Sequence, residues 1–254
     1  MYFQKSRRTL AATLGVLSFL MTLMVALFIS CGDDNKAVAP DNSTTGTVTD
    51  IDGNVYQTVK IGTQWWMAEN LRVTHYRNGD TIPNVTDSAT WVNLTTGAWS
   101  AYAHDPNNVA TYGRLYNWFT VDDSRIIAPL GWHVPTDAEW KQLEMTLGMS
   151  QAQADSMNWR GSVEGGMLKD TGIAHWQTPN VGATNEKGFK ALPGGMHHMN
   201  SHFQSLGIDG YFWSTTESSG TLVWHRSLNY NRSTLYRAIN LKNYGFSIRC
   251  VKNN

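Results

Sequence analysis

The stretch GWHVPTDAEW, residues 131–140, contains the clearest start of a helix in the chain. Thr136 follows Pro135 and precedes Glu139 by three residues, which is the spacing of a capping box. The apolar positions that follow share one helical face, and Gly148 is the residue type that most often ends a helix in the left-handed conformation. The sequence therefore predicts a helix from Thr136 to about Gly148, with a buried face formed by Trp140, Leu143 and Leu147.

Shorter elements flank this helix on both sides. Toward the N-terminus, residues 55–61 alternate and are rich in β-formers, residues 62–63 turn, and residues 64–67 return as the second strand of a hairpin. Residues 112–121 fit a helix or a strand equally well. After a second helical stretch at residues 150–157, Gly-rich turns separate short predicted strands at residues 211–215, 221–228, 234–239 and 246–251. This order predicts one α+β domain with antiparallel strands and two or three helices.

The composition is that of a folded protein and excludes one class of partner. Of the 254 residues, 41% are hydrophobic, 16% are charged and 11 are Trp, which is too apolar and aromatic for a disordered chain. Three of the 20 basic residues precede Cys31, so the rest of the chain is slightly acidic and shows no Lys/Arg stripe. Nucleic acid is not an expected partner, because binding to its phosphates requires such a stripe.

The N-terminus has the layout of a secretory signal. Lys5, Arg7 and Arg8 precede residues 9–29, which carry no charge, and Ser30 then stands directly before Cys31. A basic start, an apolar middle and a small residue at the end are typical of signal peptides. The sequence predicts a signal peptide over residues 1–30, a polar tether over residues 31–46 and an outward-facing domain over residues 47–254. A retained membrane-spanning anchor remains the alternative, because the apolar run is long enough to cross a bilayer.

The junction at Cys31 resembles the lipobox of bacterial lipoproteins, with Phe28 where Leu is usual and Leu27 one place further back. This resemblance implies that Cys31 carries a lipid and that the membrane is a partner through that lipid. The following stretch GDDNK, residues 32–36, resembles the acidic tag that directs some lipoproteins to the cell surface. The expected location is the outer membrane or the cell surface, with an inner-membrane anchor and a periplasmic domain as the alternative.

Five motifs carry a second resemblance. They are YGRLYNW (residues 112–118), GWHVPTDAEW (131–140), ALPGG (191–195), GYFWSTTE (210–217) and GFSIRCV (245–251). Together they resemble the Fibrobacter succinogenes major paralogous domain family, from about Val48 to the end of the chain. The resemblance implies an exported bacterial protein and does not imply a particular activity.

The helix-start motif and the chain end are also similar, more distantly, to the formylglycine-generating enzymes, which have a C-type-lectin-related fold. That similarity implies a C-type-lectin-like, sulfatase-modifying-factor-like fold for this domain. Those enzymes hold copper with two thiolates, and a soft Cu(I) site needs both of them. Here the earlier position is Gly245, and beyond Cys31 only Cys250 remains. Oxidase activity is therefore not expected, and neither is a cofactor; Cys250 is expected to be buried and unreactive.

His197, His198 and His202 form the main His cluster, and their spacing would suit a zinc site if they lay on a helix. The glycines before them and the polar residues between them favour a loop, and the nearest acidic residue is Asp209. No metal site is expected.

The Trp residues suggest both a core and a contact surface. Most of them lie in the family motifs and are expected in the core, notably Trp118, Trp132, Trp140 and Trp213. Residues 78–110 are loop-like, and their aromatic side chains are the candidates for ligand contact: Trp91, Trp99 and Tyr102. We expect a binding or adhesion module for a polysaccharide, a protein or another envelope component. The alternatives are a diverged enzyme related to the formylglycine-generating enzymes and a purely structural envelope protein.

Overall fold

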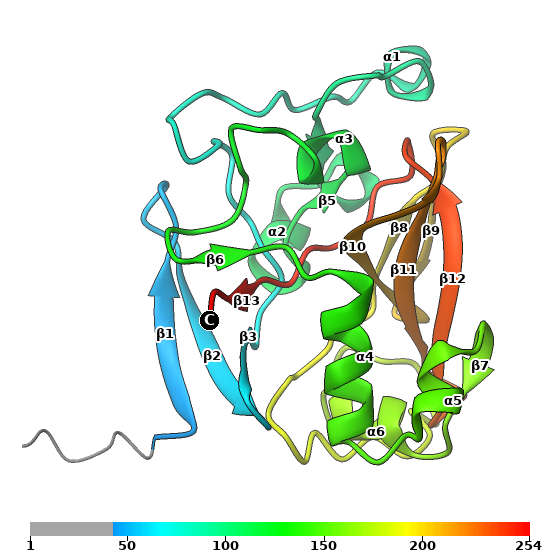
Figure 1. Cartoon of the computed structure of the whole chain (residues 1–254). Helices are drawn as coiled ribbons and strands as arrows, with labels where there is room; N and C mark the ends of the chain where they lie inside the picture. The colour runs from blue at the N-terminus through cyan, green and yellow to red at the C-terminus, as the bar shows by residue number, and fades with distance from the viewer. Residues whose placement is uncertain (1–42) are drawn as a thin grey trace, which may run out of the picture. The chain divides into compact units, whose positions relative to one another are not determined.

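The computed structural model describes residues 43–254, which form one compact unit (Figure 1). The predicted signal peptide, the lipid attachment at Cys31 and residues 31–42 of the tether lie outside the described residues. Within residues 43–254, no helix has both the length and the apolar character needed to cross a membrane. The described part is α+β, with mostly antiparallel strands and short helices, which confirms the predicted fold class.

The first sheet has the strand order β1-β2-β3-β13-β6 and is antiparallel throughout. The predicted hairpin is confirmed, because residues 55–61 pair with residues 64–67 across the turn at Gly62 and Thr63. The five strands are β1 (Thr45–Thr49), β2 (Val55–Ile61), β3 (Gln64–Met67), β6 (Trp132–His133) and β13 (Val251–Lys252).

The second sheet has the order β7-β12-β11-β10-β8-β9, and its strands β10, β11 and β12 correspond to the strands predicted at residues 211–215, 221–228 and 234–239. Its pairs are antiparallel except for β8 and β10, which meet in parallel at Gly195 and Gly210. A small third sheet pairs β4 (Trp99–Ser100) with β5 (Leu115–Tyr116). The strands of the second sheet are β7 (Asn158–Arg160), β8 (Gly194–His197), β9 (Phe203–Leu206), β10 (Asp209–Ser219), β11 (Leu222–Asn229) and β12 (Leu235–Leu241).

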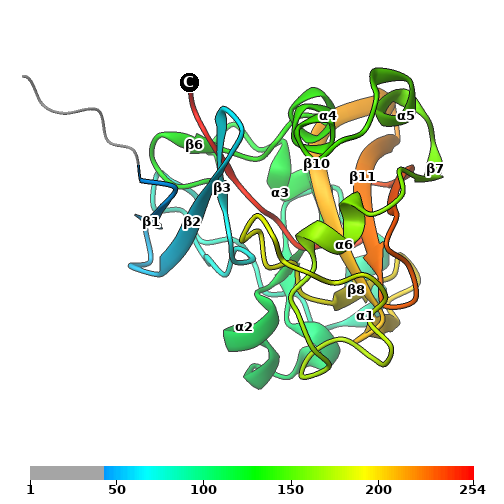
Figure 2. The same ribbon diagram turned by 90° about the horizontal axis from the view of Figure 1, so that it is seen from below.

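The predicted last strand, residues 246–251, is wrong in extent. Only Val251 and Lys252 belong to a strand, and the residues before them form single bridges with different partners, Phe246 with Tyr116 and Ser247 with Phe212. The segment changes partner at almost every residue because it runs between the two large sheets (Figures 1 and 2). Residues 245–250 therefore connect the two sheets but do not form a continuous strand in either sheet.

The helices are more numerous than the sequence suggested. Residues 43–254 contain six α-helices, of which only α4 (Asp137–Thr146) exceeds six residues. Helices this short show no clear apolar periodicity. Residues 112–121 fitted both a helix and a strand because they contain the short strand β5 followed by the short helix α3. The other helices are α1 (Ser88–Val92), the 3-10 turn η1 (Tyr102–His104), α2 (Asn107–Tyr112), α3 (Trp118–Val121), α5 (Gln151–Asp155) and α6 (Glu164–Leu168).

The capping box at the start of α4 is confirmed. The Thr136 hydroxyl accepts from the backbone N–H of Glu139 at 3.2 Å, and the Glu139 carboxylate accepts from the Thr136 N–H at 2.8 Å. Trp140, Leu143 and Leu147 are buried on one face, as predicted. They pack into a core cluster with Trp66 and residues of both large sheets.

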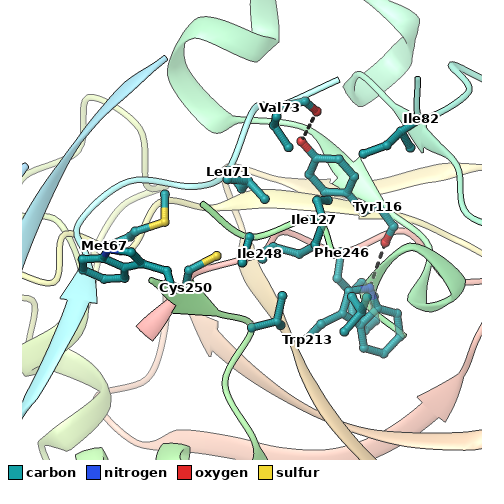
Figure 3. Close-up of a cluster of buried hydrophobic side chains, with 14 of the residues drawn as sticks. Met67, Leu71, Val73, Ile82, Tyr116, Ile127, Trp213, Phe246, Ile248 and Cys250 are labelled. Atoms are coloured by element: carbon teal, nitrogen blue, oxygen red, sulfur yellow. Dashed lines mark hydrogen bonds between the residues drawn. The ribbon is translucent and has the colours of Figure 1, made fainter. Parts of the chain in front are cut away.

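A second core cluster lies around the C-terminal segment (Figure 3). The Tyr116 hydroxyl donates to the Val73 carbonyl at 2.7 Å, and Trp213 Nε1 donates to the Tyr116 carbonyl at 2.8 Å. Cys250 is fully buried in this cluster beside apolar side chains. The predicted core positions Trp118, Trp132, Trp140 and Trp213 are all confirmed as buried.

Candidate functional site

Trp91 was expected on a contact surface, and this prediction is wrong. Its side chain is fully buried, its Nε1 donates to the Asn243 carbonyl at 2.9 Å, and its ring stacks on His197 with centroids 4.0 Å apart. The loop-rich segment that contains it folds back over the end of the second sheet. Trp91 therefore belongs to the interior of the domain and cannot touch a ligand.

The other two candidates differ from each other. Trp99 is half-buried, and its Nε1 donates to the Ile82 carbonyl at 2.9 Å, which fixes the indole plane. The guanidinium of Arg114 lies 4.1 Å from the centroid of its ring. Tyr102 packs its ring on Phe203 with centroids 5.2 Å apart and does not line the hollow that Trp99 lines. The structure thus separates the two predicted contact residues.

Three surface hollows lie side by side around α2, which Figure 2 shows at the periphery of the domain. Val109 lines all three hollows, Arg72 lines two of them and Arg114 also lines two, so the hollows form one continuous surface. We call this surface the α2 surface. Its polar and aromatic lining includes Asp52, Glu69, Asn70, Arg72, His75, Asn84, Trp99, Arg114, His175 and Lys190.

A close backbone contact holds α2 against the segment that follows β3. Gly113 has a φ of +74°, and a Cβ at this position would lie 2.7 Å from the Cβ of Asn70 and 2.8 Å from the Leu71 carbonyl oxygen. Arg114 then donates its backbone N–H to the Leu71 carbonyl at 3.1 Å. Only glycine accommodates both the conformation and the approach. This contact sets Arg114 beside Arg72.

The two arginines of the α2 surface have different surroundings. Arg72 donates to the Glu69 carboxylate at 3.0 Å and to the Val55 carbonyl at 2.8 Å, so its charge is compensated. Arg114 donates from Nη1 to the Arg72 carbonyl at 2.7 Å, and no carboxylate within residues 43–254 forms an ion pair with it. Its Nε is buried without a hydrogen-bond partner among those residues.

An acid–imidazole pair forms one wall of the surface. Asp52 Oδ1 lies 2.5 Å from His75 Nδ1, while its Oδ2 accepts from the backbone N–H and the hydroxyl of Thr74. Burial alone would raise the pKa of Asp52, but the hydrogen bonds from Thr74 and His75 outweigh it and lower the pKa. The pair holds the imidazole in one orientation. The lowered pKa keeps Asp52 negatively charged, and both of its carboxylate oxygens are engaged by Thr74 and His75.

A buried cation lies beneath the hollow that Asn70 lines. Arg249 is fully buried and donates to Asn70 Oδ1 at 2.7 Å and to the carbonyls of Met67, Phe189 and Lys190 at 3.0, 2.6 and 2.9 Å. Burial lowers the pKa of Arg249 to about 9. Its partners are neutral, so its positive charge is not cancelled by a hydrogen-bonded carboxylate. This charge acts on the hollow from below.

The His cluster does not converge. His197 is buried between Trp91 and Phe203, whereas His198 lies against Tyr244 and His202 is exposed. Burial lowers the pKa of His197 to about 3. In the part of the chain that the structure describes, no three His, Cys, Asp or Glu side chains are grouped so that they could hold a metal ion.

Gly245, where the resemblance to the formylglycine-generating enzymes would place a second thiolate, has no room for a side chain. A Cβ there would lie 2.9 Å from the Cβ of His197 and 3.0 Å from the ring of Trp91. Cys250 is inaccessible in the apolar core, and burial raises the pKa of its thiol well above the usual range. The two positions therefore do not form a thiolate pair.

The fold and the surface define an α+β protein that has two large sheets, a C-terminal segment between them and a polar, cation-bearing surface around α2. A family model described as the Fibrobacter succinogenes major domain matches residues 59–252. The chain belongs to this family. Neither a curated protein nor a solved structure matches the chain.

Proposed function

We propose that the domain is a binding module and that its α2 surface holds an envelope polysaccharide. The observation that carries this proposal is the stacking of Arg114 on Trp99 where two of the hollows meet. The indole holds the Arg114 guanidinium beside both hollows, and a guanidinium donates hydrogen bonds to sugar oxygens. The remaining lining residues supply further donors and acceptors.

The proposal also covers the location of the protein. A lipid on Cys31 would hold the chain at the outer membrane or the cell surface, with the domain facing outward. The support is the signal-like N-terminus, the small residue before Cys31 and the acidic stretch behind it. An outward-facing module on a short tether is well placed to hold envelope polymers.

We also propose a C-type-lectin-like fold that is distantly related to the formylglycine-generating enzymes. The support is the similarity of residues 132–140 and of the chain end to those enzymes, together with an end segment that closes the domain between two sheets. The fold by itself implies neither sugar binding nor catalysis.

The test is a glycan array probed with the full chain in detergent, followed by affinity measurements on two matched variants. Trp99→Ala removes the indole of the α2 surface. Trp159→Ala is the control, because Trp159 is also half-buried and also carries a stacked arginine, Arg232, with its guanidinium 4.8 Å from the ring. Each variant is first checked for an intact fold by a thermal melt.

We expect the wild type and Trp159→Ala to retain the same glycans and Trp99→Ala to lose them by about tenfold or more, within the range measured for aromatic anchors. A blank array, or equal retention by both variants, would contradict the proposal.

A further inference from the structure

From the charges on the α2 surface we infer that its ligand is an acidic polysaccharide, one whose sugar carboxylates are bound by Arg114 and Lys190. The inference rests on the proposed function and adds the chemical class of the ligand. It follows from which charges on this surface are already compensated and which are free to bind an anion.

Both acidic residues of the α2 surface are occupied by neighbours. Glu69 accepts from Arg72 at 3.0 Å and from the Gln57 N–H at 2.8 Å, and Asp52 accepts from Thr74 and His75. Glu69 compensates Arg72, and two further cations of the surface, Arg114 and Lys190, have no ion pair within residues 43–254. Three lining cations face two lining carboxylates, so positive charge is in excess on this surface.

Arg114 has the geometry of a carboxylate receptor. Its guanidinium lies 4.1 Å from the centroid of the Trp99 ring, and a guanidinium presents its N–H donors as a planar fork that matches a carboxylate. Within residues 43–254 its side chain donates one hydrogen bond, from Nη1 to the Arg72 carbonyl. The two terminal nitrogens therefore retain donors for a bidentate carboxylate, a pairing that is about twice as strong as a neutral hydrogen bond.

Lys190 is the cation that lines the neighbouring hollow. Lys190 is exposed and lines the hollow on the far side of α2, and its carbonyl accepts from the buried Arg249 at 2.9 Å. Arg249 forms hydrogen bonds only to carbonyl and amide oxygens, and the nearby carboxylates of Glu69 and Asp170 act on its charge from a longer range. Arg114 and Lys190 thus lie in different hollows of one continuous surface, as a polymer with repeated carboxylates would require.

The test compares acidic oligosaccharides with their own methyl esters, which keep the sugar ring and remove the charge. Oligogalacturonate and oligomannuronate are titrated into the full chain in detergent at low and at physiological salt. Arg114→Gln and Lys190→Gln are the test variants. Arg114→Lys keeps the charge and tests whether binding needs the planar guanidinium group. Arg232→Gln is the matched control, because Arg232 also stacks on a tryptophan and has no ion pair in the described region but does not line the α2 surface.

We expect at least one acidic oligosaccharide to bind about tenfold or more tightly than its methyl ester, with most of the difference lost in Arg114→Gln and part of it in Lys190→Gln. Arg232→Gln should bind like the wild type. Equal binding of acid and ester, or an Arg114→Gln variant that binds normally, overturns the inference while leaving the proposed function intact. Binding of neither acids nor esters overturns the inference, and a blank glycan array then overturns the proposed function as well.

Discussion

Asp137 is one residue on which the stability of the second half of the domain depends. Its buried carboxylate accepts from Arg226 at 2.8 Å and from Arg237 at 2.9 and 2.7 Å, and Arg226 also donates to the buried Glu144. Burial alone would raise the pKa of Asp137, but the hydrogen bonds and charges of the two arginines hold it well below its usual range. The residue thus ties the start of α4 to strands β11 and β12.

Replacement of Asp137 by Asn should destabilise the protein by about 3–5 kcal/mol at neutral pH, because two buried guanidinium groups lose their shared counter-charge. An unfolded aspartate has a pKa of about 3.9. Since folding depresses the pKa, the stabilisation is complete above about pH 4 and is lost as the pH falls toward the folded-state value.

The measurement is chemical denaturation of both proteins from pH 7 to pH 2. The difference in unfolding free energy between wild type and Asp137→Asn should shrink below about pH 4. Asp155→Asn, which removes an exposed partner of Lys141, is the control and should change little. A constant difference across the series would show that the carboxylate is not the titrating group.

Cys250 should react slowly with a thiol reagent in the native protein and rapidly after unfolding, because the thiolate is the reactive form and burial suppresses it. Cys250→Ser should lower the unfolding free energy by about 1–3 kcal/mol, since a buried hydroxyl would lack a partner. Fast native labelling, or stoichiometric copper(I) binding that Cys250→Ser abolishes, would show that the thiol is accessible.

Residue by residue, the sequence predicted the buried core better than the exposed contact surface. Cys250 and the core tryptophans were predicted correctly because apolar residues inside ordered motifs usually lie in a core. Trp91 was placed on the surface because its segment looks like a loop, and no local signal shows that the loop folds inward. Arg114 was missed because its role depends on Trp99 and Arg72, which come together only in the tertiary structure.

At the scale of elements, the helix start at Thr136 gives the sharpest prediction. Thr136→Ala should lower the unfolding free energy by about 1 kcal/mol, because the first turn of α4 loses its capping hydroxyl. Ser150→Ala removes the equivalent hydroxyl from α5, which is only five residues long and exposed at its start, and should have a smaller effect. If the melting temperature of Thr136→Ala equals that of the wild type, the packing of Trp140 rather than the cap determines where the helix begins.

The elements that could be predicted have a complete local signal. The hairpin of β2 and β3 has an alternating pattern and a Gly turn, and α4 has a cap, an apolar face and a terminating glycine. The other helices span fewer than two turns, and α2 ends against Asn70 at Gly113, a long-range contact. The sequence pattern of residues 246–250 is typical of a strand, but their backbone partners lie in different sheets. A sequence pattern does not show which sheet a residue pairs with.

At the scale of the whole molecule, membrane attachment is the prediction that the N-terminus supports. Cys31→Ala should abolish metabolic labelling by a fatty-acid probe and leave an unprocessed precursor, because the proposed lipid acceptor is lost. Cys250→Ser is the control, since the only other cysteine in the chain lies in the core. Undiminished labelling of Cys31→Ala would place the anchor elsewhere.

The arrangement of the domain explains how a rigid scaffold can present the α2 surface. The C-terminal segment bonds to both large sheets, and Arg249 within it bonds to the loops at residues 67–70 and 189–190 that lie beneath the surface. The floor of the surface is therefore part of the core. The proposed ligand would therefore meet a surface that needs little ordering on binding.

The most direct test of the binding site is hydrogen exchange on the full chain, with and without envelope polysaccharide from the bacterium that carries it. The account predicts slower exchange confined to the α2 surface, that is, to residues 52–54, 68–75, 84–86, 99–114, 175 and 190–192. Arg114→Gln should remove this protection, and Arg232→Gln should retain it. Protection at another face of the domain, or unchanged exchange at the α2 surface in the presence of a polysaccharide that binds, would contradict the account.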